Sequence, residues 1–129
     1  SSPMIAYLWA GVEGFSKFGS YTGNGSVNGP FVWCGGFSPS FIMIKETSGT
    51  GGWFIIDDAR DPTNDNTTER LYADTNGAGV ADTGGDSKGI LDFLSNGFKL
   101  RDDGSINTNG DTYVFMAFAK TPFKTATAR

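Results

Sequence analysis

Short apolar segments, each ended by Gly, Pro, Asn or Asp, recur along the whole of this chain. No window of about eleven residues keeps apolar residues at helical spacing, whereas apolar or alternating runs of about four to eight residues are typical of strands. We therefore expect an all-β fold, an antiparallel β-sandwich of the jelly-roll or concanavalin-A-like kind with about eight or nine strands. The expected strands are residues 4–9, 17–22, 30–35, 41–46, 53–57, 70–74, 90–94, 98–101 and 112–119.

The composition agrees with a chain of strands and turns. Glycine provides 19 of the 129 residues, and aspartate, which forms turns, greatly outnumbers glutamate, which forms helices. The length fits one domain with a sizeable core. We expect a single β-sandwich domain over residues 1–129.

Two local patterns refine this expectation. In "DFLSNGFKLR", the pair Asn96-Gly97 predicts a type I′ turn between two paired strands. In "TYVFMAFA" (112–119) and "MIAYLW" (4–9) both faces are apolar, so we expect these strands to be central or to lie against another subunit. The segment from residue 7 also resembles the segment from residue 115, so residues 1–13 are a candidate last strand of a preceding tandem copy.

Charge and residue usage exclude several classes of function. The net charge of −4 argues against nucleic acid as a partner, and no apolar run approaches the roughly 20 residues that span a bilayer. The absence of histidine excludes Ser-His-Asp and Cys-His catalysis and histidine-based zinc sites. Cys34, the one cysteine, lies in the apolar run "FVWCGG" and is expected to be a buried structural thiol.

The stretch "WFIIDDARDPTNDN" (53–66) raises the question of carboxylate chemistry. Adjacent Asp57 and Asp58 point to opposite faces of a strand, and no glutamate stands at the spacing of a sandwich glycosidase, so we expect no catalytic residues. Calcium is the one cofactor considered, because segments 57–66 and 73–86 are rich in oxygen ligands; turn formation explains them better, and we expect neither a metal nor a cofactor.

Exposed aromatic side chains beside polar loops are the remaining candidates for ligand binding. The longest polar loops are 47–53, 58–69 and 75–89, expected at the ends of a rigid sandwich. The candidate ligand-binding residues in and beside them are Trp53, Arg60, Asn64, Arg70 and Tyr72. Turn or surface duty is the alternative for each of them. Trp9 and Trp33 are expected in the core.

The segments "FSKFGSYTGNG", "GFSPSFIMIK", "DFLSNGFKLR" and "YVFMAFAKTPFKTATAR" resemble a repeated β-rich domain of virion proteins from marine bacteriophages, often tail-fibre or tail-spike proteins. The similarity runs over about residues 14–129, and "GAGVADTGGDSKG" (77–89) departs from the pattern as a variable surface loop. It implies a non-enzymatic structural module on the virion surface. We expect the polar loops of such a module to attach to a host-surface glycan. We also expect other virion subunits as partners and, because strands 4–9 and 112–119 are apolar on both faces, a homo-oligomer, with a trimer favoured. Two alternatives stay open: a purely architectural capsid-decoration or fibre-shaft protein, and a polysaccharide depolymerase.

Overall fold

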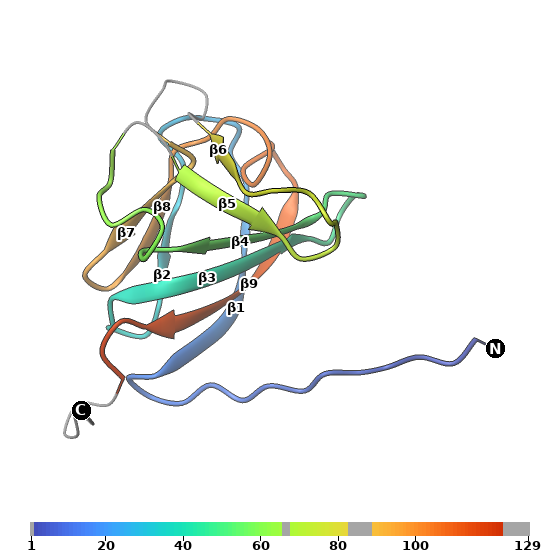
Figure 1. The fold of residues 1–129 in the computed structure, drawn as a ribbon, viewed down its shortest axis with the longest axis horizontal. Coiled ribbons are helices and arrows are strands. Elements are labelled where there is room, and N and C mark those ends of the chain that lie inside the picture. The colour runs from blue at the N-terminus through green and yellow to red at the C-terminus, as the bar shows by residue number, and fades with distance from the viewer. Residues whose placement is uncertain (1, 66–67, 83–88, 123–129) are drawn as a thin grey trace.

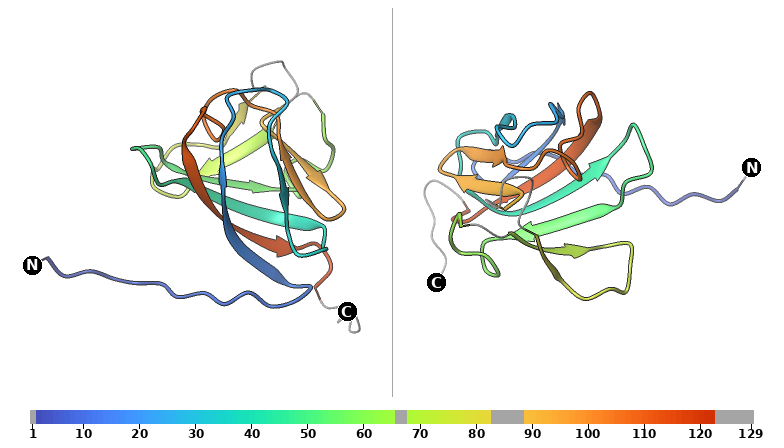
Figure 2. Two further views of the ribbon diagram at one scale, coloured as in Figure 1. Left: turned by 180° about the vertical axis from the view of Figure 1, so that it is seen from behind. Right: turned by 90° about the horizontal axis from the view of Figure 1, so that it is seen from above.

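The computed structural model describes residues 2–65, 68–82 and 89–122, which form nine strands in two antiparallel sheets. The strands are β1 (Ser16–Thr22), β2 (Phe31–Trp33), β3 (Pro39–Glu46), β4 (Trp53–Asp57), β5 (Thr68–Tyr72), β6 (Val80–Asp82), β7 (Leu91–Leu94), β8 (Gly97–Leu100) and β9 (Thr112–Ala119). A six-stranded sheet of order β1-β9-β3-β4-β5-β6 lies against a three-stranded sheet of order β2-β8-β7 (Figures 1 and 2). This arrangement confirms the predicted antiparallel β-sandwich.

The core lies between the two sheets and follows from side-chain alternation along the strands. The six-stranded sheet contributes Ile42 and Ile44 from β3, Phe54 and Ile56 from β4, and Tyr113, Phe115 and Ala117 from β9. The opposing sheet contributes Val32, Leu91, Phe98 and Leu100. Because β1 and β2 are edge strands of their respective sheets, the core between them is closed only by side chains.

Strand β9 is central, as its two apolar faces predicted. It pairs with β1 on one side and with β3 on the other. Tyr113, Phe115 and Ala117 face the core, whereas Val114, Met116 and Phe118 lie on the outer face of the six-stranded sheet. The outer face is therefore apolar as well, although no second layer of the described chain covers it.

The predicted strand at residues 4–9 is wrong. These residues form no strand and extend as an arm away from the body (Figure 1). The cause is a tight turn in which the Phe15 and Ser16 amides donate to the Val12 carbonyl, at 3.0 and 2.9 Å, and direct the chain away from the sheet. Conversely, β6 lies inside the segment 77–89, which the sequence had indicated to be a loop; residues 83–88 lie outside the described part.

The predicted hairpin is present, but its turn differs. Leu94 pairs with Gly97, so the two connecting residues are Ser95 and Asn96, and neither has a positive φ. A type I′ turn at Asn96-Gly97 is therefore wrong. Gly97 is needed for another reason: a Cβ there would overlap the Val32 carbonyl oxygen on the neighbouring strand β2.

A buried asparagine ties two loops together at one end of the sandwich. The Asn107 Nδ2 donates to the Asn24 Oδ1 and the Ser26 carbonyl, both at 2.9 Å, and to the Asp102 carbonyl at 2.7 Å. Its Oδ1 accepts from the Asn24 amide at 2.9 Å. Because Asn107 is fully buried and its amide is paired on both sides, it fixes the β1–β2 loop against the β8–β9 loop.

Candidate functional site

A groove runs between the edge strands β1 and β2, where the two sheets part. It has two adjoining hollows of about 270 and 390 Å³. Lys17 and Trp33 line both hollows and stand at their boundary. The first hollow is completed by Phe18, Gly19, Ser20, Tyr21, Phe31, Val32 and Phe115.

Trp33 and Phe31 give this groove its aromatic character. Strand β2 buries Val32 between them and leaves Trp33 55% and Phe31 46% exposed. The expectation that Trp33 lies in the core is wrong, and so is that for Trp9, which is 59% exposed. Val32 in this short strand and Cys34 directly after it take the inward positions, so both large rings project outward.

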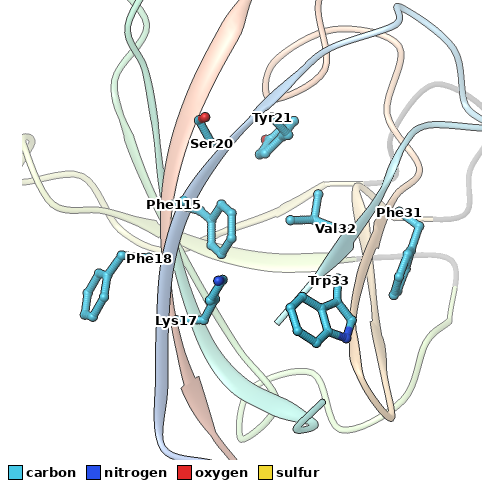
Figure 3. Close-up of a pocket in the computed structure, with 9 residues that line it drawn as sticks. Lys17, Phe18, Ser20, Tyr21, Phe31, Val32, Trp33 and Phe115 are labelled. Atoms are coloured by element: carbon cyan, nitrogen blue, oxygen red, sulfur yellow. The ribbon is translucent and has the colours of Figure 1, made fainter. Parts of the chain in front are cut away.

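A lysine from the opposite sheet holds the exposed indole. The Lys17 Nζ lies 5.5 Å from the centre of the Trp33 ring, in the geometry of a cation–π interaction. Figure 3 shows Lys17 reaching from β1 toward Trp33, while Phe18 points to the other side of β1. The lysine thus supplies positive charge at an aromatic surface and restrains the ring.

The floor and upper end of the groove are rigid. A Cβ at Gly19 would lie 3.0 Å from the Phe115 ring, so glycine lets the buried Phe115 ring pack closely against the backbone of β1. The Tyr21 ring stacks on Tyr113, with centroids 5.1 Å apart, and its hydroxyl donates to the Ile106 carbonyl at 2.8 Å. Burial, with the nearby Tyr113 and Asp102, raises the pKa of Tyr21 well above its ordinary value.

Cys34 closes strand β2 beneath the groove. It is fully buried, as predicted, and burial raises the pKa of its thiol to about 12, although Lys17 acts in the opposite direction. Gly35 and Gly36 follow with φ of 78° and 86°, a conformation that side chains rarely adopt. The sequence "WCGG" therefore turns the chain sharply after the exposed indole.

The five residues singled out from the sequence do not form one surface. Trp53 lines a different hollow, on the outer face of the six-stranded sheet. Arg70 and Tyr72 are brought together on the inner face of β5, where the guanidinium lies 5.1 Å from the Phe54 ring centre and 5.3 Å from that of Tyr72. That arrangement packs the end of the sheet.

Arg60 and Asn64 both make contacts that organise the β4–β5 loop. Arg60 forms an ion pair with Asp57, and its amide donates to the Asp57 Oδ1 at 3.0 Å. The Asn64 side chain donates to the Phe93 carbonyl and accepts from the Phe93 amide, each at 2.8 Å, so it joins the loop to β7. Whether either residue also binds a ligand stays a prediction.

The aspartates of this loop have separate partners. Asp57 pairs with Arg60, whereas Asp58 lies 2.7 Å from the Lys120 Nζ. Burial, with the neighbouring carboxylates Asp65 and Glu69, raises the pKa of Asp61. Within residues 2–65, 68–82 and 89–122, no three His, Cys, Asp or Glu side chains group in a way that could hold a metal ion.

The polar loops predicted to carry contacts lie at two ends of the sheet. The β3–β4 and β5–β6 connections are neighbours, since a Cβ at Gly52 would meet the Asp74 carboxylate at 3.1 Å. The β4–β5 loop is at the opposite end, because β4 runs antiparallel to both of its neighbours. Residues 66–67 and 83–88 of these loops lie outside the described residues. The described residues contain no helix that is long and apolar enough to cross a membrane.

The fold and the groove define a two-layer β-sandwich with an aromatic groove between its sheet edges. Over residues 1–122 the chain matches the family described as a domain of unknown function, DUF7483, and it belongs to that family. No curated protein and no solved structure matches it.

Proposed function

We propose that this chain is a non-catalytic binding module on the surface of a bacteriophage virion, and that the groove between β1 and β2 attaches the particle to a host glycan. The observation that carries the proposal is the pair of exposed rings, Trp33 and Phe31, on one side of a three-residue strand. A flat ring that is exposed and restrained offers a stacking surface for the apolar face of a sugar.

The chemistry of the groove suits a saccharide. Lys17 brings hydrogen-bond donors and a positive charge to the Trp33 ring, and sugar hydroxyl and carboxylate groups accept such bonds. The strand edges of β1 and β2 add backbone groups along the same groove. A polysaccharide with repeated units can therefore occupy both hollows, one on each side of Lys17.

The virion assignment is supported by the resemblance of "FSKFGSYTGNG", "GFSPSFIMIK" and "DFLSNGFKLR" to phage structural proteins. In a tail fibre or spike, other virion subunits and further copies of the chain are the partners, with a trimer favoured. Several weak sites on one particle then act together, because the first contact raises the effective concentration of the others.

A purely architectural role is the second candidate, and the apolar outer face of the six-stranded sheet favours it. Such a capsid-decoration or fibre-shaft protein needs the sandwich but not the groove. The two candidates therefore differ in what they predict for Trp33.

The test is calorimetric binding of the full chain to soluble oligosaccharides from host-envelope polysaccharides, with cello-, chito- and alginate oligomers as defined probes. We expect Trp33→Ala to weaken binding at least tenfold, or about 1.4 kcal/mol. Trp9→Ala is the matched control, since Trp9 is equally exposed but outside the groove. Unchanged binding by Trp33→Ala would contradict the proposed groove and place the glycan elsewhere on the chain. No binding by any probe, together with normal adsorption of a phage that carries Trp33→Ala, supports the architectural role. Release of reducing ends supports the depolymerase.

A further inference from the structure

The N-terminal arm, residues 2–12, is an apolar segment without a charged residue. Its large side chains are almost fully exposed: Met4 93%, Ile5 83%, Tyr7 78% and Leu8 94%. Contiguous apolar side chains that remain in water are a mark of an interaction site. The arm therefore carries an unpartnered apolar strip.

The direction of the arm is fixed where it leaves the body. Val12 bridges to Ser16, and the Val12 amide donates to the Ser16 Oγ at 3.1 Å. The Trp9 ring then stacks on Phe18 and meets Phe118 edge-on, with centroids 6.2 and 6.5 Å away. Beyond Trp9 the arm continues away from the sandwich (Figures 1 and 2), so its first residues lie beyond its own sheet.

The outer face of the six-stranded sheet presents a complementary surface. A hollow of about 750 Å³ lies over β9, β3 and β4. Its lining is apolar except for Asp74, and consists of Tyr7, Trp9, Phe41, Met43, Trp53, Ala73, Asp74, Met116 and Phe118. Tyr7 and Trp9 border the hollow from the arm side and leave it open.

We propose that this hollow receives the exposed side chains Met4, Ile5 and Leu8 of a second copy of the chain. Every copy carries both the exposed arm and the open hollow, so an exchange of arms between copies covers both surfaces with no other partner. The apolar and uncharged arm matches a lining with a single carboxylate at its rim. The proposal goes beyond the glycan-binding function and does not depend on the groove between β1 and β2.

The first test measures the mass of the full chain in solution at micromolar concentration by light scattering. Arm exchange predicts two or three times the chain mass of 13.7 kDa for the wild type, and the single-chain mass for the double variant Ile5→Asp/Leu8→Asp. Both side chains contact nothing that buries them, so the variant is expected to fold. Thr22→Asp/Asn109→Asp adds the same charge at exposed positions away from the arm and should keep the wild-type mass. A monomeric wild type, or an unchanged mass for Ile5→Asp/Leu8→Asp, overturns the proposal.

The second test asks which chain the arm occupies. Chains carrying Leu8→Cys are mixed with chains carrying Met43→Cys and oxidised; Cys34 is fully buried and does not compete. We expect a disulfide-linked dimer that contains one chain of each variant. Its yield should clearly exceed the yield of disulfide-linked dimer that either variant forms when it is oxidised alone. If the mixture gives no such species and Leu8→Cys/Met43→Cys links within one chain, the arm closes on its own sheet and the proposal is wrong.

Discussion

Lys17 and Trp33 meet across the open edges of the two sheets, with the Lys17 Nζ 5.5 Å from the centre of an indole ring that is 55% exposed. One residue comes from β1 and the other from β2, so the contact bridges the two layers where no strand pairing does. It places a restrained aromatic surface and a cation side by side at the boundary of two hollows. The proposed binding function depends on that arrangement.

Replacing Lys17 tests whether its positive charge beside the Trp33 ring contributes to oligosaccharide affinity. We expect Lys17→Ala to weaken oligosaccharide binding about two- to fivefold, because an exposed cation–π contact contributes about 0.5–1 kcal/mol. Lys17→Arg keeps a cation over the indole and should retain most of the affinity. Calorimetry on the two variants gives the comparison, and equal loss in both would show that the amine acts in some other way.

Among the polar residues of the β1–β2 and β8–β9 loops, Asn107 is expected to lose the most folding stability when it is substituted. Asn107→Asp replaces a buried NH2 group, whose two N–H bonds are shared among three acceptors, by a carboxylate oxygen, so unfolding should require about 2–3 kcal/mol less. Urea denaturation measures this change. Asn109→Asp introduces the same charge at an exposed position two residues away and should alter stability by less than about 0.5 kcal/mol. Similar losses in both variants would mean that charge, rather than the lost bonds, is responsible.

Asn64 distinguishes loop organisation from ligand binding. Asn64→Ala removes both hydrogen bonds to the Phe93 backbone and should lower the free energy of unfolding by about 1 kcal/mol. We expect its affinity for the oligosaccharide to match that of the wild type. A loss of affinity without a loss of stability would instead support Asn64 as a ligand-binding residue.

The reactivity of the Cys34 thiol and the pH dependence of stability test whether this side chain is buried in the core. With a pKa of about 12, only about one thiol in ten thousand is ionised at pH 8. Ellman's reagent should therefore react very slowly with the folded chain and fully in guanidinium. The pKa is higher in the folded state than the ordinary 9.0, so the native protein loses stability as the pH rises from 9 toward 12. Cys34→Ala should reduce that loss, and rapid labelling at pH 8 would show that the thiol is accessible.

The sandwich is predictable because short apolar segments bounded by turn residues mark the strands. The central position of strand 112–119 follows from its two apolar faces, but which face points inward does not; the structure buries Tyr113, Phe115 and Ala117. The arm at 4–9 was misread because its apolar residues look like a strand, whereas a turn at Val12–Ser16 directs it away from the sheet. The apolar pattern of residues 4–9 does not show in which direction the following turn sends the chain.

The groove between β1 and β2 was not predicted from the sequence, for a related reason. "FVWCGG" is apolar throughout, and periodicity does not say whether its rings or its smaller residues face inward. The signal that could have found it is side-chain size: Val32 and Cys34 are compact and occupy the core, so Phe31 and Trp33 at the alternate positions point outward. The partner Lys17 lies in a different sheet, so its position depends on how the sheets pack.

Glycan binding in the groove between β1 and β2 can be tested most directly by a nuclear magnetic resonance titration of the full chain with an oligosaccharide that binds. Trp9, Trp33 and Trp53 give three indole N–H signals, one from the groove and two from the opposite face of the six-stranded sheet. Binding in the groove between β1 and β2 predicts a saturable shift of the Trp33 signal, while the signals of Trp9 and Trp53 stay in place. A shift of the Trp53 signal with Trp33 unchanged would contradict it and place the glycan on the opposite face.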